Sequence, residues 1–377
     1  MKALVLAGGH GTRLRPFSHS IPKQLVPVAN KPVLFHVLDT LRKAGVTETG
    51  IIVGAPGDAI RAAVGDGSRF GMAVTYLPQD RPLGLAHCVL IARDFLGDDD
   101  FVMYLADNVF ADGIAEPLLE FQERRPDAQL MVAKAAEPTE CGIAEVDGTG
   151  RVLGVEEKPD RPRSDLAVTG VYCFGPRIHE AVRAIRPSAR GELEITDAIQ
   201  WLVTENRDVQ ARPLAGPWHD TGTVEGLLEC NRTLLERLRP EVRGAVAAGT
   251  VITGPVVVAD GARIERSVIT GPALIGPGCT VRDSRIGPAT SLGAGCRLED
   301  ADIEYSMVLD EASVVGVRPL AGSVIGRSAR VRRPSAAPRV HRLVVGDDGS
   351  VEVAAGSVEA ASGSVEVAAG DGRGEDA

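Results

Sequence analysis

The sequence predicts an α/β domain of about 240 residues followed by a stack of triangular β coils. Short apolar runs alternate with amphipathic segments up to residue 240, a pattern typical of a sheet covered by helices. Aliphatic residues then recur every 17 residues from Ile252 onward. After Gly349 the chain changes again, to the small and acidic heptads GSVEVAA, GSVEAAS and GSVEVAA.

The α/β part contains six runs that we expect to be strands. A helix should close this part over residues 224–238, because leucines recur there at i, i+3 and i+4 and Pro240 follows. The expected strands are residues 3–7, 50–53, 73–77, 101–105, 129–133 and 168–174, and the helices between them include 33–44 and 85–95.

The 17-residue period divides into steps of six, six and five, which an α-helix cannot explain. A triangular coil explains it, because each face contributes one inward aliphatic side chain and stacked coils share one core. The pattern resembles the hexapeptide-repeat left-handed parallel β-helix. The expected columns are Ile252, Ile269, Ile286 and Ile303, then Val258, Ile275, Leu292 and Leu309, then Ile264, Val281, Leu298 and Val315, with Leu320, Ile325 and Val331 in a further, slipped coil.

We therefore expect three parts: residues 1–240, the β-helix at 245–335, and a hairpin with a disordered heptad tail at 336–377. The tail lacks the bulky apolar groups that offset the entropy cost of ordering. A net charge of −10 disfavours nucleic acid as a partner. No apolar run approaches the ~20 residues of a membrane span, and the first apolar run is too short for a signal peptide. We predict a cytoplasmic protein with reduced, mostly buried cysteines and no zinc site.

The first apolar run ends in AGGHGTRL, a tight glycine turn. Gly9 and Gly11 fit the first two positions of G-x-G-x-x-G, but Leu14 occupies the third. The chain has no Gly-Lys pair, which excludes a P-loop. The turn can still present backbone N–H groups to a phosphate, with Arg13 and Lys23 as cations. An ordinary β–α turn with an exposed arginine is the alternative.

Three further charged residues occupy positions typical of binding sites. Asp107 ends the apolar run FVMYLA, where α/β sheets place ligands. The alternative for Asp107 is an Asx-turn or a helix cap. Asp220, in WHDTG, precedes a turn and a helix, so helix capping is its alternative too. Lys158, in EEKP, is restricted by the following Pro159; a solvated charge is its alternative.

The stretch LAGGHGTRLRPFSHSIPKQLVPVANKP resembles the signature of the sugar-phosphate nucleotidylyltransferases, G-G-x-G-T-R-L followed by P-K. Within that family, the Lys-Gln form of the second motif is most similar to the glucose-1-phosphate thymidylyltransferases. The segments PLGLAH, LADN, EEKP, AVTGVY, RGELEITD and WHDTG follow in the family order. The resemblance covers residues 1 to about 240, and the β-helix matches the long form of the family.

This resemblance implies a Rossmann-like nucleotidyltransferase domain with a mixed, mainly parallel sheet. It implies Mg²⁺-dependent conversion of dTTP and α-D-glucose 1-phosphate to dTDP-glucose and pyrophosphate, the entry step to dTDP-deoxysugars, by a homo-oligomer without a membrane or nucleic-acid partner. The implied catalytic residues are Arg13, Lys23, Asp107, Lys158 and Asp220, and both aspartates would hold the metal. The implied nucleotide site is Gly8, Gly9, Gly11, Thr12, Arg13, Lys23, Gln24, Gln79 and Gly84, and the implied sugar-phosphate site is Leu85, Gly142, Glu157, Lys158 and Val168.

Three alternatives stay open from the sequence. The first is the same chemistry with UTP or another sugar phosphate. The second is acetyl transfer by the β-helix, which usually requires a histidine, yet no histidine lies between residues 220 and 340. The third is a non-catalytic sugar-nucleotide sensor, which the complete set of charged positions disfavours.

Overall fold

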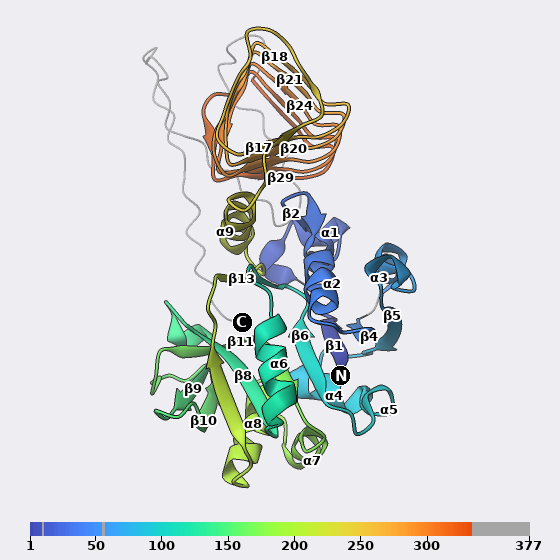
Figure 1. The fold of residues 1–377 in the computed structure, drawn as a ribbon, viewed down its shortest axis with the longest axis vertical. Helices are drawn as coiled ribbons and strands as arrows, with labels where there is room; N and C mark the ends of the chain where they lie inside the picture. The colour runs from blue at the N-terminus through green and yellow to red at the C-terminus, as the bar shows by residue number, and fades with distance from the viewer. Residues whose placement is uncertain (10, 55–56, 334–377) are drawn as a thin grey trace, which may run out of the picture.

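A computed structural model describes residues 1–9, 11–54 and 57–333. A mixed sheet covered by helices is joined through α9 (Val224–Leu235) to a parallel β-helix (Figure 1). The predicted fold class is therefore confirmed as a Rossmann-like domain followed by a β-helix. The hairpin and tail expected within residues 336–377 lie outside the described residues.

The large sheet has the order β10-β9-β11-β6-β1-β4-β5, with β8 paired to β11 and β12. Strands β6, β1, β4 and β5 run parallel, and β11 joins them antiparallel to β6. Consequently the carboxyl ends of β1 and β6 meet at one edge. The strands are β1 (Lys2–Ala7), β4 (Glu48–Val53), β5 (Ala73–Pro78), β6 (Phe101–Leu105), β8 (Ala128–Lys134), β9 (Gly142–Val146), β10 (Val152–Glu157), β11 (Leu166–Phe174) and β12 (Val209–Pro213).

Helices cover both faces of this sheet, so the central strand β1 is apolar and buried from Ala3 to Ala7. Leu4 and Leu6 of β1 belong to one core cluster, and Ala3, Val5 and Ala7 belong to the other. Burial on both faces is typical of parallel strands in α/β folds. The helices are α1 (Phe17–Ser20), α2 (Val33–Lys43), α3 (Asp58–Val64), α4 (Leu85–Ile91), α5 (Arg93–Leu96), α6 (Ala115–Arg124), α7 (Ile178–Ala184) and α8 (Ile195–Thr204), besides α9.

The predicted strands of the α/β part are all present, whereas two helices differ from expectation. The helix expected at 85–95 is divided at Ala92 into α4 and α5. Helix α9 ends at Leu235 rather than at Leu238, because Arg237 and Leu238 donate to carbonyls three residues earlier, which tightens the last turn. Short 3-10 turns η1 (Thr12–Leu14), η2 (Lys23–Leu25), η3 (Ser68–Phe70) and η4 (Pro138–Glu140), and the small pairs β2 (Pro27–Val28) with β3 (Lys31–Pro32) and β7 (Asn108–Phe110) with β13 (Trp218–Asp220), complete this part.

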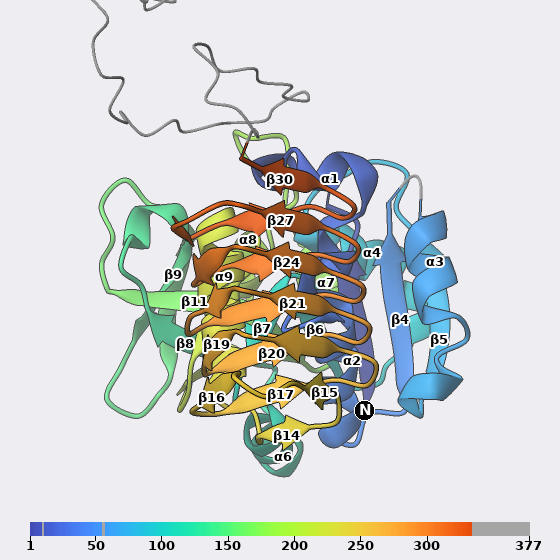
Figure 2. The same cartoon turned by 90° about the horizontal axis from the view of Figure 1, so that it is seen from above.

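The β-helix consists of three parallel sheets, whose strands stack coil upon coil (Figure 2). The first sheet is β14 (Glu241–Val242), β17 (Val256–Val258), β20 (Ala273–Ile275), β23 (Thr290–Leu292), β26 (Met307–Val308) and β29 (Val324–Ile325). The second is β15 (Ala245–Val246), β18 (Arg263–Glu265), β21 (Thr280–Arg282), β24 (Arg297–Glu299), β27 (Ser313–Val315) and β30 (Arg330–Arg332). The third is β16 (Val251–Thr253), β19 (Val268–Thr270), β22 (Arg285–Ile286), β25 (Asp302–Glu304) and β28 (Leu320–Ala321).

The predicted aliphatic columns were wrong by one position at two residues. Leu292 pairs with Val308 rather than Leu309, and Leu298 pairs with Val314 rather than Val315. The reason is a shortened corner: four residues separate Ile303 from Val308, where five separate the equivalent residues of the preceding coil. The corner before Leu320 is one residue longer, so Leu320 pairs with Ile303 again. The predicted slipped last coil is therefore confirmed.

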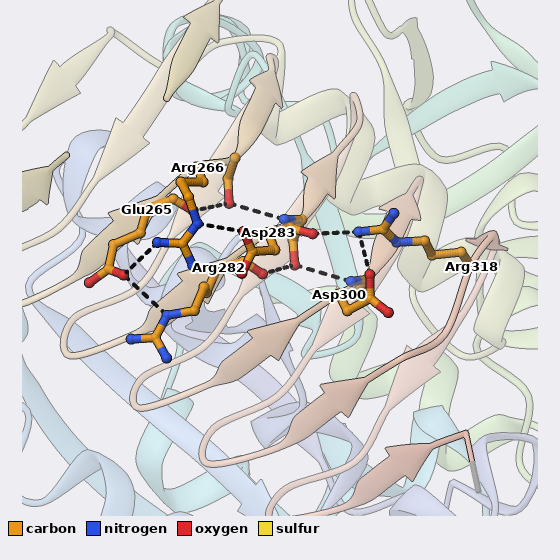
Figure 3. A network of polar contacts seen from close by, with 9 residues as sticks. Glu265, Arg266, Arg282, Asp283, Asp300 and Arg318 are labelled. Carbon is orange, nitrogen blue, oxygen red and sulfur yellow. Dashed lines mark hydrogen bonds and ion pairs between the residues drawn. The ribbon is translucent and has the colours of Figure 1, made fainter. Parts of the chain in front are cut away.

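An exposed ladder of charges connects successive coils at one corner of the β-helix (Figure 3). Arg266 donates to both carboxylate oxygens of Asp283 at 2.7 Å, and Arg318 lies 2.7 Å from Asp300. The residues Arg266, Asp283 and Asp300 all have positive φ angles, which turn the chain at this corner. The ladder therefore helps to fix the stacking register on the solvent side.

Two other sequence expectations concern cysteines and membrane spans. All six cysteines are free thiols, and all but the partly exposed Cys141 are buried, as predicted. Within the described ranges, no helix has the length and apolar character needed to cross a membrane.

Candidate active site

The glycine turn and Asp107 lie together because they follow neighbouring parallel strands. Leu6 of β1 pairs with Leu105 of β6, and the Ala106 N–H donates to the Leu6 carbonyl at 3.1 Å. Gly8 and Asp107 therefore leave the same edge of the sheet. This is the edge where open α/β sheets bind ligands.

Lys23 lies across the glycine turn and pairs with Asp107. Its Nζ forms an ion pair with Asp107 Oδ2, and both side chains are about five-sixths buried, with exposures of 16% and 15%. A Cβ at Gly9 would lie 3.3 Å from Lys23 Cε, and one at Gly11 would lie 2.9 Å from Lys23 Cβ. Gly11 also has a φ of 64°, which favours glycine. Because Gly9 and Gly11 have no side chains, there is room for the Lys23 side chain to pass over the turn.

Asp220 is brought to Asp107 by a short antiparallel pair. In the β13–β7 ladder, Asp220 is opposite Asn108, and Thr221 donates to the Asp107 carbonyl from its N–H and its hydroxyl at 2.9 and 2.7 Å. Asp220 is exposed to solvent. Desolvation of its carboxylate by the surrounding protein, followed by the negative charge of Asp107, nevertheless raises its pKa above the ordinary aspartate value.

Arg13 extends the positive charge of the site toward Asp220. It lies in the 3-10 turn η1, and its guanidinium is 3.5 Å from the position that a Cβ of Gly222 would take. Together with Lys23 and the Gly222 N–H, which donates to Asp220 Oδ1 at 2.8 Å, it opposes the rise in the pKa of Asp220. Thr12 beside it is exposed, so these two side chains form the rim of the site.

A cavity of about 230 Å³ lies against the turn and collects most of the predicted nucleotide residues. Gln24 is buried here, and its Oε1 has no hydrogen-bond partner among the described residues. An orphaned buried acceptor costs free energy unless a ligand or water satisfies it. The lining includes the predicted residues Gly8, Gly9, Lys23, Gln24, Gln79, Gly84, Leu85 and Asp107.

Gln79 and Gly84 form the far wall of this cavity. Gln79 Nε2 lies 3.1 Å from His87 Nδ1 and donates to Cys88 Sγ at 3.3 Å, while Oε1 lies above Gly8. Burial raises the pKa of Cys88 to about 12, so this thiol is neutral. Gly84 has a φ of 103°, and any side chain there would meet the backbone of Leu193.

Of the predicted sugar-phosphate residues, Gly142, Glu157 and Val168 lie on β9, β10 and β11, whereas Leu85 begins α4 and lines the cavity. Gly142 is opposite Glu157 in the β9–β10 pair, and Val168 is almost fully buried in β11. Thr196 donates to Glu157 Oε2 at 3.2 Å, and Arg190 lies 3.4 Å from Oε1. Desolvation, followed by the charge of nearby Glu194, raises the pKa of Glu157.

Lys158 follows β10 in an unusual backbone conformation. Its φ is 45°, which an L side chain adopts only at a cost, and its N–H donates to the Cys141 carbonyl at 3.1 Å. Its Nζ lies 3.6 Å from Glu140. The charges of Asp220 and Lys158 both affect the pKa of Cys141, which burial raises first of all. Lys158 and Asp220 thus both lie within electrostatic range of Cys141, and the ion pair of Lys158 is with Glu140 rather than with Asp220.

The sequence reasoning missed residues that orient the predicted ones. Asn108 Nδ2 donates to Asp107 Oδ1 at 2.9 Å, and Trp218 Nε1 donates to Asn108 Oδ1 at 2.6 Å. Arg190 holds Glu157, and Glu192 lines the cavity. All four belong to the quoted segments LADN, WHDTG and RGELEITD, but the sequence assigns no contact between them.

The donor set fits a divalent cation that also binds phosphate. Across the described ranges, no group of three or more histidine, cysteine, aspartate or glutamate side chains is placed to hold a metal. One or two carboxylates, with substrate phosphates completing the shell, are the usual protein ligands of Mg²⁺. Desolvation and the charge of Asp107 raise the pKa of Asp220, as expected where two carboxylates lie close together.

Residues 2–237 match the family described as nucleotidyl transferase, which is more than half of the chain. The chain belongs to the nucleotidyl transferase family. Residues 238–324 of this nucleotidyltransferase match a second description, GlmU-like C-terminal hexapeptide. Both matches agree with the two parts of the fold.

A glucose-1-phosphate thymidylyltransferase from Streptomyces griseus is 53% identical to the nucleotidyltransferase over 355 residues, covering 94% of this chain and all of the relative. A Bacillus anthracis crystal structure, provisionally named a glucose-1-phosphate thymidylyltransferase and bound to sucrose, has a TM-score of 0.58 at 34% identity. It covers 62% of this chain and 95% of that one. A UDP-glucose pyrophosphorylase bound to UDP-glucose has a TM-score of 0.56 at 25% identity, covering 61% and 96%.

Proposed function

We propose that the chain joins dTTP and α-D-glucose 1-phosphate into dTDP-glucose and pyrophosphate, the first step toward dTDP-deoxysugars. The observation that carries this proposal is the convergence of Lys23, Asp107 and Asp220 beside the glycine turn. The 53% identity to a thymidylyltransferase over the full length of that relative supports the choice of substrates.

In the proposed reaction, an oxygen of the sugar phosphate attacks the α-phosphorus of dTTP in line, and pyrophosphate leaves. No covalent intermediate with the protein is required, so the protein contributes position and charge neutralisation. Lys23 and Arg13 hold the triphosphate and stabilise the negative charge on the leaving pyrophosphate. Lys158 orients the attacking phosphate, which the triphosphate would otherwise repel.

Asp107 and Asp220 are the residues that would hold Mg²⁺. When bound, the ion neutralises charge on the phosphate oxygens of the reacting group. In this structure Lys23 pairs with Asp107, and Asn108 donates to the second oxygen of the same carboxylate. We infer that Lys23 moves from this carboxylate to the triphosphate when the nucleotide binds.

Gln79 is the residue that would recognise the base. Its Nε2 is directed at His87 and Cys88, which leaves Oε1 above Gly8 to accept from the imide N–H of a pyrimidine. Thymine and uracil present the same imide group. This contact therefore favours thymine and uracil over cytosine and adenine, whose ring nitrogen at this edge carries no hydrogen, and UTP remains the second candidate, in line with the similarity to a UDP-glucose pyrophosphorylase.

Glu157 is the residue that would accept hydrogen bonds from the sugar hydroxyls. Thr196 and Arg190 fix its carboxylate from one side. Gly142, opposite it, has no side chain to fill the space beside the carboxylate: a Cβ there would lie 3.1 Å from Glu157 Oε2.

Release of pyrophosphate from each pair of substrates tests the proposal. The purified protein is given dTTP, UTP, ATP or GTP with glucose 1-phosphate or another sugar 1-phosphate, with and without Mg²⁺. We expect the fastest release from dTTP with glucose 1-phosphate, and none without a divalent cation. Failure of that pair, with rapid turnover of another pair, would refute the named activity.

A further inference from the structure

The segment that carries Arg13 and Lys23 lies between the α/β domain and the β-helix. We call residues 11–33 the phosphate-binding segment. Helix α1 and strand β2 of this segment lie beside the coils (Figure 1), in agreement with the contacts of Phe17 and Asn30 with the β-helix. The contacts across this boundary connect the β-helix to the residues that face the cavity.

Asn231 of α9 is the polar centre of the boundary and is fully buried. Its Oδ1 accepts from the Ala29 N–H and from Ser291 Oγ, both at 3.0 Å. Its Nδ2 donates to the Ala289 carbonyl at 3.2 Å. One side chain thus connects the phosphate-binding segment, α9 and the coil that contains β23.

The turn between β2 and β3 makes a second connection. Ala29 and Asn30 have φ angles of 47° and 59°, the two positive values that a tight hairpin turn requires. Asn30 is exposed, and its Nδ2 donates to the Leu292 carbonyl of β23 at 2.5 Å. The Lys23 carbonyl accepts from the Val26 N–H at the start of this hairpin. The turn is therefore linked to the catalytic lysine through a short stretch of backbone.

Apolar contacts complete the boundary. Leu14, directly after Arg13, belongs to one buried cluster with Leu227 of α9 and Met307 of the β-helix. The ring of Phe17 in α1 lies 3.5 Å from the position that a Cβ of Gly326 would take in the last coil. Both ends of the phosphate-binding segment therefore contact the β-helix.

We propose that the β-helix positions the phosphate-binding segment and that Asn231 and Asn30 are its positioning residues. Neither residue lines the cavity; both hold the turn at Ala29 and Asn30, which belongs to the segment that carries Arg13 and Lys23. A segment that is already fixed loses less entropy when the triphosphate binds, so affinity for the nucleotide rises. The inference rests on the proposed roles of Arg13 and Lys23.

The substitution Asn30→Gly tests this positioning role with little risk to folding. Glycine adopts the same positive φ, so the turn is kept and the bond to Leu292 is removed. We expect the KM for the nucleoside triphosphate to rise roughly threefold to tenfold, the equivalent of about one net hydrogen bond. The KM for the sugar phosphate should not change, since Lys158 and Glu157 lie on other elements. Asn231→Ala should act in the same direction and more strongly, with a lower Tm.

Arg266→Ala is the matched control, because it weakens the same coil stack at the exposed ladder of Figure 3. It should lower Tm and leave both KM values unchanged. The assay uses the substrates that the unmodified chain turns over, so an error in the substrate assignment would be seen there first. If Asn30→Gly left both KM values unchanged, or raised both equally, the positioning role would be wrong, whatever the folding of Asn231→Ala.

Discussion

Asp107 and Asp220 bring two negative charges close together at the end of the sheet. Lys23 pairs with Asp107, while Asp220 accepts a backbone hydrogen bond from Gly222. Asp220 keeps the raised pKa despite these contacts, because desolvation and the charge of Asp107 exceed them. The repulsion between the two carboxylates lowers the stability of the folded state. Such a cost is common at functional sites, where activity is retained at the expense of stability.

Asp220→Asn should therefore raise Tm at neutral pH in the absence of ligands while kcat falls roughly 100-fold or more. The raised pKa means that the folded state favours the proton on Asp220. Stability from this group is complete below the ordinary aspartate pKa and is lost as pH rises through the raised value. The gain in Tm should therefore shrink as the pH falls toward the ordinary aspartate pKa, where Asp220 is protonated in both the folded and the unfolded state. Thermal melts at several pH values, with kinetics, check this; near-wild-type kcat would remove Asp220 from the metal site, and an unchanged Tm would contradict the electrostatic argument.

Lys158 and Arg13 should have separable effects, because Arg13 lies in η1 after the glycine turn, whereas Lys158 follows β10. Lys158→Ala should mainly raise the KM for the sugar phosphate, and Arg13→Ala should mainly raise the KM for dTTP. Initial rates with each substrate varied in turn measure both values. If either variant changed both KM values to a similar extent, Lys158 and Arg13 would not each act on a different substrate.

At the scale of elements, β11 and β7 together set the orientation of Asp107. Asn108 donates to the Asp107 carboxylate and accepts from Trp218, so three residues act in series. Asn108 fits because its neighbour on β11 is Gly170. A Cβ there would lie 2.5 Å from Asn108 Cγ.

Gly170→Ala should displace Asn108 and lower kcat by roughly tenfold to a hundredfold, because a shift near 1 Å at a reacting group costs about that much. Gly175→Ala, directly after β11, is the matched control, since the nearest atom to its Cβ would be 3.7 Å away. Steady-state kinetics and melts of both variants decide the matter. Equal kcat values for the two would show that Asn108 does not orient Asp107.

At the scale of the molecule, the β-helix covers α9 and the phosphate-binding segment. The apolar cluster at this boundary includes Leu227 and Leu228 of α9 and Met307 of the β-helix. The homo-oligomer and the cytoplasmic location predicted from the sequence stay predictions, as does the absence of a nucleic-acid partner. The assembly is open to direct measurement.

Truncation after Arg239 should expose part of this apolar boundary and lower either solubility or oligomer order. Size-exclusion chromatography with light scattering on the full and shortened chains measures the change. The site residues of the α/β domain would all be retained. If both chains ran as the same well-behaved species with equal activity, a role of the β-helix in assembly would be excluded.

Deletion of the residues after Asp348 should leave activity and Tm essentially unchanged. The expectation comes from the composition of the heptads, which offer little apolar surface for burial. These residues lie outside the described part of the chain. Thermal melts and initial rates of the shortened protein test the point, and a loss of several degrees would show that the heptads pack against the rest.

The sequence by itself determined the features that depend on local periodicity and on residues close along the chain. The 17-residue ladder predicted the coils, since each strand buries its own aliphatic residue, and the glycine turn predicted the position of Lys23. It could not locate the shortened corner at Tyr305, because Leu309 and Val315 kept an apparently perfect period although Val308 and Val314 occupy the core.

Only the tertiary structure decided which distant residues meet. Trp218 supports Asn108 across 110 residues, and Asn231 joins Ala29 to Ser291 across more than 200. No periodicity reports such pairs, since they depend on how the finished sheet, α9 and the coils pack against one another. Burial makes each of these hydrogen bonds important for stability, because a polar group removed from water costs free energy unless it has a partner within the fold.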